Sequence, residues 1–215
     1  MVEEIFDIYD AEGKWVGTAP RSEVHARGHW HRTVHCWLVR RGEDGKARVL
    51  FQLRSDGKDT NPGRCDITAA GHLAAGETPR EAVRELEEEL GLAVAFEELV
   101  PYAVVREEAS GIVRGKRFVD REVSHVFGYV TDWRPGQFRL QEEEVAGLYE
   151  AEAGELIALM EGGLDEVSAD GIRLREGAAE PGSIAIRASS FVPRDPAYYV
   201  GVFRFLEKLA RGSDG

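Results

Sequence analysis

The segment 71–92, GHLAAGETPREAVRELEEELGL, constrains the fold more than any other part of the chain because it specifies a short helix together with both of its ends. Thr78 is a good N-cap, Pro79 suits the first helical position, and Glu81 completes a capping box with Thr78. Gly91 is placed to end the helix. The sequence therefore predicts a helix that runs from about Thr78 to Gly91.

This predicted helix has three kinds of face, where a plain surface helix has two. At about 100° per residue, one apolar arc faces the core and holds Ala82, Val83, Leu86 and Leu90. A second arc is acidic and holds Glu81, Glu85, Glu88 and Glu89. Like charges three or four residues apart cost roughly 0.2–0.5 kcal/mol per pair, and a divalent cation would offset that repulsion. The alternative is a solvated acidic face partly paired with Arg80 and Arg84.

The same segment resembles the Nudix box, the signature of the Nudix hydrolase superfamily. That box reads Gly, five residues, Glu, seven residues, and then Arg-Glu-apolar-any-Glu-Glu-any-Gly-apolar. The chain supplies every specified residue type, at Gly71, Glu77, Arg84, Glu85, Leu86, Glu88, Glu89, Gly91 and Leu92. One spacing departs, because six residues separate Glu77 from Arg84 where the family has seven. The loop before the helix must absorb a turn of about 100°.

The resemblance implies a Mg²⁺- or Mn²⁺-dependent pyrophosphohydrolase that cleaves a diphosphate linkage in a nucleotide-type small molecule. Carried over residue by residue, the metal ligands would be Glu85, Glu88 and Glu89, and the catalytic residues would be Arg84, Glu85 and Glu88. Arg84 would orient the carboxylates, while the metal neutralises phosphate charge and lowers the pKa of a bound water. The general base is either Glu85 or a member of the run Glu142, Glu143 and Glu144, and the sequence leaves that choice open.

A second resemblance narrows the branch of the superfamily. Residues 4–10, 21–25, 31–32, 52–55, 58–59, 62–63 and 70–72 look like the Nudix branch nearest the isopentenyl-diphosphate isomerases. In those isomerases a second metal site uses two histidines seven apart, a Gly-His and two acids at i,i+2. The nearest positions here are His25, His31, His72, Asp120 and Glu122. The first two histidines are six apart, and a lone histidine is more often a surface or core residue, so this site stays open.

Two further features separate the chain from the isomerases. Their catalytic cysteine stands immediately before the Gly-His, where this chain has Ala70, and their Nudix box is usually degraded, whereas this chain keeps its carboxylates. Protonating an alkene needs the missing acid, while hydrolysing a pyrophosphate needs the carboxylates. We therefore expect a hydrolase. The alternatives are an isomerase of prenyl diphosphates and a non-catalytic Nudix-fold nucleotide-binding module. Cys65 is interpreted as a small buried apolar residue.

Length and composition agree with a single-domain enzyme. The 215 residues, 43% of them hydrophobic, allow one sizeable core. A formal net charge of −12 argues against a nucleic-acid-binding protein. The acidic start lacks the features of a signal peptide, no segment reads as a membrane span, and two cysteines fit a reducing compartment. We expect a cytoplasmic enzyme for a small-molecule diphosphate, with neither nucleic acid nor membrane as partner.

Alternation of apolar residues and the position of turn residues predict the remaining elements. Residues 5–9 and 15–18 read as a hairpin, 33–39 and 49–53 as paired strands, and 66–70 as a short strand that leads to the acidic helix. Longer strands span 94–106 and 117–130, and their connection 107–116 is a candidate for substrate specificity. A strand from residue 145 and a helix over 154–160 complete a Nudix domain of residues 1–162.

The remaining residues, 163–215, are predicted to pack on the same domain. From 162 to 184 large apolar residues are few, which indicates a loosely ordered connector. A C-terminal helix over 196–211 carries apolar side chains for docking on the domain or for a homodimer contact, namely Tyr199, Val202, Phe203, Phe205 and Leu206. The expected fold is α/β, the Nudix fold: a mixed β-sheet sandwiched between α-helices, with an N-terminal β-hairpin and a C-terminal helical extension.

Overall fold

The computed structural model describes residues 3–58, 60–113 and 116–212. The strands are β1 (Ile5–Tyr9), β2 (Trp15–Pro20), β3 (Trp30–Arg41), β4 (Ala47–Arg54), β5 (Cys65–Asp66), β6 (Ala69–His72), β7 (Val100–Val113), β8 (Lys116–Val130), β9 (Val145–Glu152), β10 (Val167–Arg175) and β11 (Ala178–Ile186). The helices are α1 (Arg21–Arg27), α2 (Ala82–Leu90), α3 (Ala153–Met160) and α4 (Pro196–Arg211). None of the described helices is long and apolar enough to cross a membrane.

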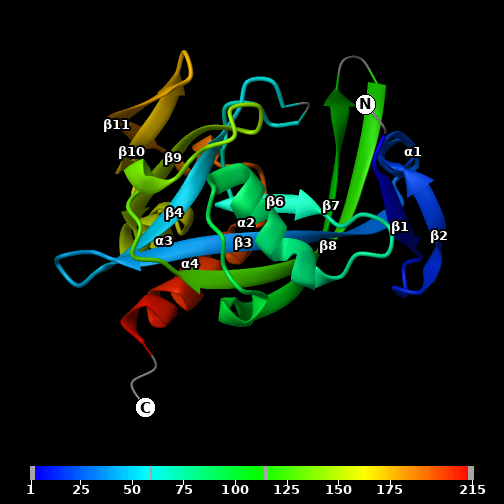
Figure 1. Ribbon diagram of the computed structural model, residues 1–215, viewed down its shortest axis with the longest axis horizontal. Coiled ribbons are helices and arrows are strands. Elements are labelled where there is room, and N and C mark those ends of the chain that lie inside the picture. The colour runs from blue at the N-terminus through cyan, green and yellow to red at the C-terminus, as the bar shows by residue number, and fades with distance from the viewer. Residues whose placement is uncertain (1–2, 59, 114–115, 213–215) are drawn as a thin grey trace.

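Strand β3 is the centre of a mixed sheet. It pairs antiparallel with β4 and β6 and parallel with β8, and seven consecutive residues from Thr33 to Val39 are buried. Burial on both faces is typical of a strand covered on both sides. On one face Val34 and Leu38 pack with Leu86 of α2, which crosses in front of β3 (Figure 1). On the other face Trp37 packs with residues of α3 and α4. The predicted mixed sheet between helices is confirmed.

The acidic helix forms where the sequence predicts it. Thr78 is the N-cap with a complete capping box, a 3-10 turn covers Pro79–Glu81, and α2 follows directly. At the other end Gly91 adopts a left-handed conformation with φ of 68°, which glycine accommodates without strain. The side chains of Leu86 and Leu90 are fully buried.

The N-terminal hairpin, the β3–β4 pair, the strand from residue 145 and both later helices are confirmed. Three boundaries are corrected. The short strand 66–70 is divided into β5 and β6, and β7 begins only at Val100, after a 3-10 turn at Phe96–Glu98. Most of the predicted connection 107–116 is strand, because β7 and β8 stay paired to Val113 and Lys116; residues 114–115 lie outside the described part.

The predicted connector 162–184 is wrong, because this part of the chain forms the hairpin β10–β11. Strand β10 pairs with β9 and β11 pairs with β10, so the hairpin extends the sheet by two strands. In β10, Val167 and Ala169 are buried in the core on the α4 face and Ile172 in the core on the α2 face, whereas β11 is the edge strand and is mostly exposed. An edge hairpin that buries only a few of its side chains needs few large apolar residues, so its composition resembles that of a loop.

Helix α4 packs on the domain. Its Tyr199, Val202, Phe203 and Leu206 are buried in the core cluster on the α4 face of β3. Phe205 stacks on Tyr102 of β7, with ring centroids 4.8 Å apart. The apolar face of the helix is thus used within the chain, and both the homodimer and the boundary at residue 162 stay predictions.

Candidate active site

Arg84 of α2 links the loop before the helix to the acidic face. Its guanidinium donates to both carboxylate oxygens of Glu77, at 3.2 Å for the Nη2–Oε2 pair, and to Glu85 Oε1 at 3.3 Å. Glu77 is itself fixed, because its Oε2 accepts a hydrogen bond of 2.8 Å from the backbone N–H of Ala74. The loop before the helix thus accommodates the short spacing, and Glu77 and Arg84 are in contact.

Glu85 lies directly over the Gly71 backbone of β6. A Cβ built on Gly71 would lie 2.2 Å from Glu85 Cδ. Burial raises the pKa of Glu85, and the ion pair with Arg84 only partly opposes this shift. Gly71 therefore leaves the space that the Glu85 carboxylate fills.

Glu89 is the most buried carboxylate of α2. It is 5% exposed, and burial together with the charge of Glu85 raises its pKa well above the usual value. Gln52 Nε2 donates to its Oε2 at 3.4 Å. Glu88, by contrast, has a side chain that is 58% exposed and lies 3.9 Å from Arg84 Nε. Glu85 and Glu89 are thus neighbouring carboxylates with raised pKa values. A bound divalent cation would stabilise their ionised forms, so the pair fits a cation site.

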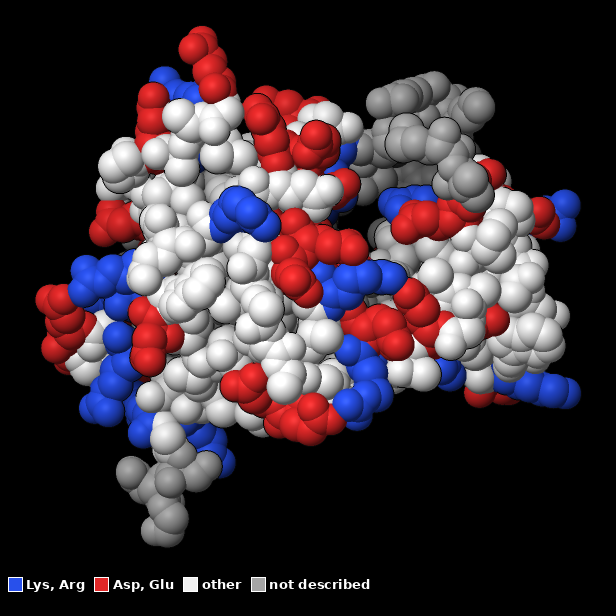
Figure 2. Space-filling view, viewed as in Figure 1, with Lys and Arg blue, Asp and Glu red and all other residues white. Residues whose placement is uncertain are grey.

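Glu144 is the member of the later acidic run that lies near this face. It forms an ion pair with Lys58, and its charge contributes to the raised pKa of Glu89. Glu142 and Glu143 are exposed in the same turn. Figure 2 shows acidic and basic side chains gathered in front of α2, at the edge of a hollow that lies between α2 and the lobe of α1, β1 and β2.

Five candidate ligands from four elements converge next to this lobe, and we call them the histidine cluster: His25 of α1, His31 of β3, His72 of β6, and Asp120 and Glu122 of β8. The Nε2 atoms of His25 and His31 each lie 3.5 Å from Asp120 Oδ1, and His72 Nε2 lies 3.6 Å from Glu122 Oε1. One nitrogen from each histidine lies within 4.8 Å of the others. The structure thus brings together all five positions that the sequence left open.

Several polar atoms that point into this cluster lack hydrogen-bond partners among the described residues. Among the described residues, four buried atoms in it have none: His25 Nε2, His31 Nε2, His72 Nε2 and Asp120 Oδ1. Buried polar atoms are ordinarily satisfied, so a converging set without partners indicates a cation-binding site. His31 Nδ1 lies 3.1 Å from the carbonyl oxygen of His29 and donates to it, which leaves the Nε2 lone pair for a metal.

The electrostatics of the cluster agree with a cation site. Burial lowers the pKa of His25, His31 and His72, so each ring is neutral and able to ligate near pH 7. Burial and the charge of Asp120 raise the pKa of Glu122 to about 8. Phe6 stacks on two of the rings, with centroids 4.9 Å from His72 and 5.5 Å from His31, and closes one side of the cluster.

Sequence reasoning missed two residues beside the histidine cluster. These residues are His35 and Glu107. One ring nitrogen of His35, one carboxylate oxygen of Glu107 and one carboxylate oxygen of Glu122 all lie within 4.8 Å of one another. His35 follows His31 by four residues on β3, so the even spacing of a strand face could have pointed to it. Glu107 could not be found in this way, because its part of β7 reads as a loop.

Neither cysteine has the character of a nucleophile. Ala70 precedes the Gly-His, as the sequence shows, and Cys65 is 2% exposed. Burial raises the pKa of the Cys65 thiol to about 12 and that of Cys36 further, so both thiols stay protonated near neutral pH. The interpretation of Cys65 as a small buried residue is confirmed.

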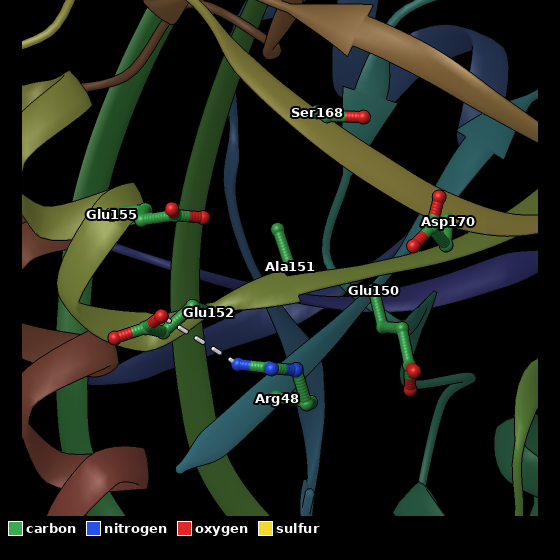
Figure 3. A pocket seen from close by; sticks show the side chains of 7 residues that line it. All are labelled: Arg48, Glu150, Ala151, Glu152, Glu155, Ser168 and Asp170. Atoms are coloured by element: carbon green, nitrogen blue, oxygen red, sulfur yellow. Dashed lines mark ion pairs between the residues drawn. The ribbon is translucent and has the colours of Figure 1, made fainter. Parts of the chain in front are cut away.

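An acidic recess formed by β4, β9, β10 and α3 contains none of the predicted site residues. It is lined by Arg48, Glu150, Ala151, Glu152, Glu155, Ser168 and Asp170 (Figure 3). Arg48 lies 3.7 Å from Glu152 and 2.7 Å from Asp44, so part of this acidic charge is paired within the protein. The recess is therefore not assigned to the active site.

Comparisons with known proteins identify the family. The NUDIX domain model matches residues 29–169, and the chain belongs to the Nudix hydrolases, a family that acts on phosphoric anhydride bonds. An uncharacterised Nudix hydrolase of Clostridium acetobutylicum is 38% identical over 207 residues, which cover 96% of this chain and 98% of that relative. The isopentenyl-diphosphate Delta-isomerase of Clavibacter michiganensis is 35% identical over 117 residues, covering 53% of this chain and 58% of that protein. The predicted isomerase-like branch is thus supported.

The fold is also shared with a solved structure. The crystal structure of DR0079 from Deinococcus radiodurans superposes with a TM-score of 0.51 at 20% identity, covering 74% of this chain and 90% of that one. This likeness concerns the fold alone. The roles of Arg84, Glu85, Glu88 and Glu89 stay predictions.

Proposed function

We propose that this protein is a Mg²⁺- or Mn²⁺-dependent pyrophosphohydrolase that cleaves a diphosphate linkage in a nucleotide-type small molecule. The observation that carries the proposal is the contact of Arg84 with both Glu77 and Glu85, which holds the Nudix-box carboxylates in place despite the shortened spacing. Glu85, Glu88 and Glu89 would hold the cation.

In the proposed reaction, side chains of the protein position the carboxylates and accept a proton from the attacking water. A bound divalent cation supplies charge neutralisation at the phosphate oxygens and a water of lowered pKa. Arg84 fixes the Glu85 carboxylate over Gly71, so the direction in which it presents its oxygens is set before substrate binds. The proton of the attacking water goes to Glu85 or to Glu144, since Glu144 is the member of its run that lies close to the buried Glu89.

We further propose that the histidine cluster holds a second divalent cation. Three neutral imidazoles and two carboxylates are a donor set suited to Mn²⁺ or Zn²⁺, and the unpartnered atoms of the cluster support this. In a hydrolase this cation would supply further positive charge for the diphosphate.

The isomerase alternative is not favoured. An isomerase of prenyl diphosphates needs an acid beside the Gly-His, and that position is Ala70. We also propose that the protein is cytoplasmic, because both cysteines are free and buried. A homodimer remains a proposal that light scattering would test.

Release of mononucleotide or phosphate from a panel of diphosphates tests the proposed function. The panel contains ADP-ribose, a dinucleotide and isopentenyl diphosphate, each with Mg²⁺, with Mn²⁺ and with chelator. Metal-dependent cleavage of a nucleotide member supports the hydrolase. Conversion of isopentenyl diphosphate without a change in phosphate count would support the isomerase, and nucleotide binding without turnover would support the binding module.

A further inference from the structure

The segment before α4 brings a buried arginine close to the histidine cluster. Phe191 forms a parallel bridge with Cys65 of β5, and the Val192 N–H donates to the Cys65 carbonyl at 2.9 Å. Two residues further on, the side chain of Arg194 is 13% exposed. This part of the chain lies beyond residue 169, where the match to the family ends.

A single side chain, that of Glu107, links Arg194 to the candidate metal ligands. Its Nη1 donates to Asp66 Oδ1 at 2.6 Å, and its Nε lies 3.5 Å from Glu107 Oε2. Glu107 in turn has a carboxylate oxygen within 4.8 Å of one on Glu122 of the histidine cluster. The guanidinium is therefore anchored on Asp66 through Nη1, and its Nε lies beside Glu107, which neighbours the histidine cluster.

Arg54 provides an internal comparison, because it binds the same carboxylate. Its Nη1 donates to Asp66 Oδ2 at 2.9 Å, and its side chain is also 13% exposed. Arg54 uses all three guanidinium nitrogens, since Nε and Nη2 donate to the Thr60 carbonyl at 3.2 and 2.9 Å. Arg194 differs: within the described part of the chain its Nη2 donates no hydrogen bond, while Nη1 also reaches the Tyr199 hydroxyl at 3.2 Å.

Arg194 does not have Asp66 to itself, because Arg54 shares that carboxylate. Asp66 is a single carboxylate between two guanidinium groups, which hold its pKa down although burial alone would raise it. Glu107 also lies beside Arg194; burial raises the pKa of its carboxyl, and Arg194 opposes that shift. Removing a guanidinium from water is costly unless its donors are used. A phosphate oxygen matches both the charge and the geometry of the unused edge.

We propose that Arg194 is a substrate-binding residue whose Nη2 donates to a phosphate oxygen of the diphosphate. The inference rests on the proposed function for the identity of the anion. It adds a contact from outside the family domain, supplied by the C-terminal segment. Arg54 has a structural role only, although it shares the Asp66 partner and the same degree of burial.

Binding of imidodiphosphate, a non-hydrolysable diphosphate, tests the proposal. Calorimetry with Mg²⁺ compares the full-length protein with Arg194→Gln, Arg194→Lys and the matched control Arg54→Gln. We expect a Kd about tenfold or more weaker for Arg194→Gln, because a hydrogen bond to a charged group is lost. Arg194→Lys keeps the charge but loses the planar fork, so about threefold weaker binding is expected. Arg54→Gln should lower the melting temperature and leave the Kd within about twofold.

Three results would overturn the proposal: no binding to the unaltered protein, an unchanged Kd for either Arg194 variant that folds, or an equal loss for Arg54→Gln. The test does not depend on turnover. If no diphosphate is cleaved but Arg194→Gln still weakens binding, the hydrolase proposal fails while the binding role stands. Cleavage combined with an unchanged Kd for Arg194→Gln would support the hydrolase and reject the binding role of Arg194.

Discussion

The carboxylate of Glu85 occupies the space that a side chain at Gly71 would need. A Cβ at Gly71 would lie 2.2 Å from Glu85 Cδ and 2.4 Å from both carboxylate oxygens. The atoms it would meet are the far end of a flexible side chain, so an added methyl group displaces the carboxylate rather than the backbone. A glycine of the Nudix box thus sets the position of a glutamate fourteen residues later.

Gly71→Ala should therefore reduce activity with little loss of stability. We expect a fall in kcat of about tenfold or more, since misplacing a group that supports a metal ligand typically costs 10–100-fold. Gly182→Ala on β11 is the control, because a Cβ there meets nothing within 4 Å. Steady-state kinetics and thermal unfolding of both variants provide the measurement. Unaltered kcat in Gly71→Ala would show that the position of Glu85 is irrelevant to turnover.

Glu88→Gln tests the role of the exposed carboxylate on α2. It removes a charge and keeps the shape, so we expect kcat/KM to fall at least about tenfold and the concentration of Mg²⁺ needed for half-maximal rate to rise. Glu87→Gln removes the same charge from the adjacent exposed position and should change the rate less than about twofold. Equal rates for the two variants would contradict the assignment of Glu88 as a metal ligand.

His72→Gln should weaken cation binding at the histidine cluster. With one of three imidazoles removed, we expect Mn²⁺ affinity to fall by about tenfold or more in calorimetric titration. His125→Gln is the control, because His125 alternates with Ser124 and Val126 on β8 and so projects from the face opposite Glu122. A Mn²⁺ affinity unaffected by His72→Gln would exclude that residue as a ligand.

The stability of the metal-free protein should fall at acidic pH through His35. Burial lowers the pKa of His35 from 6.5 to about 3, so between these values the unfolded chain binds a proton that the folded chain does not. The contribution of neutral His35 to the free energy of unfolding is complete above pH 6.5 and is lost as the pH falls toward 3. Between pH 7.5 and 5.5 this amounts to about 1.4 kcal/mol of unfolding free energy.

His35→Gln should remove that part of the pH dependence. Urea unfolding in the presence of chelator at several pH values would show a shallower decline for the variant below pH 6.5. Above pH 7.5 the two curves should run parallel, which serves as the internal reference. The same decline in both proteins would mean that His35 does not stay neutral in the folded state.

Much of the fold could be predicted because its signals are local. The cap at Thr78, the left-handed Gly91 and the apolar stripe with Leu86 and Leu90 each act within a few residues, and the helix begins and ends where they indicate. The hairpin β10–β11 was missed because its strands bury only a few of their side chains at the sheet edge. Its stability depends on pairing with β9, which no local pattern reports.

The histidine cluster shows why spacing alone could not decide the site. His25 lies on α1 and His31 on β3, and Gly28 turns the chain between them with φ of 68°. Across such a change of element, six or seven residues can bring two rings to the same point. The approach of Arg194 to Asp66 spans 128 residues and depends on the whole sheet, so it could be seen only in the folded chain.

Cleavage in ¹⁸O-labelled water tests the central claim most directly. The substrate found in the diphosphate panel would be turned over with Mg²⁺ and with chelator, and the products analysed by mass spectrometry. We predict one ¹⁸O atom on one of the two phosphate products with Mg²⁺, and no cleavage with chelator, because a metal-activated water attacks phosphorus. Turnover that persists with chelator, or products without ¹⁸O, would contradict the assignment of this protein as a metal-dependent pyrophosphohydrolase.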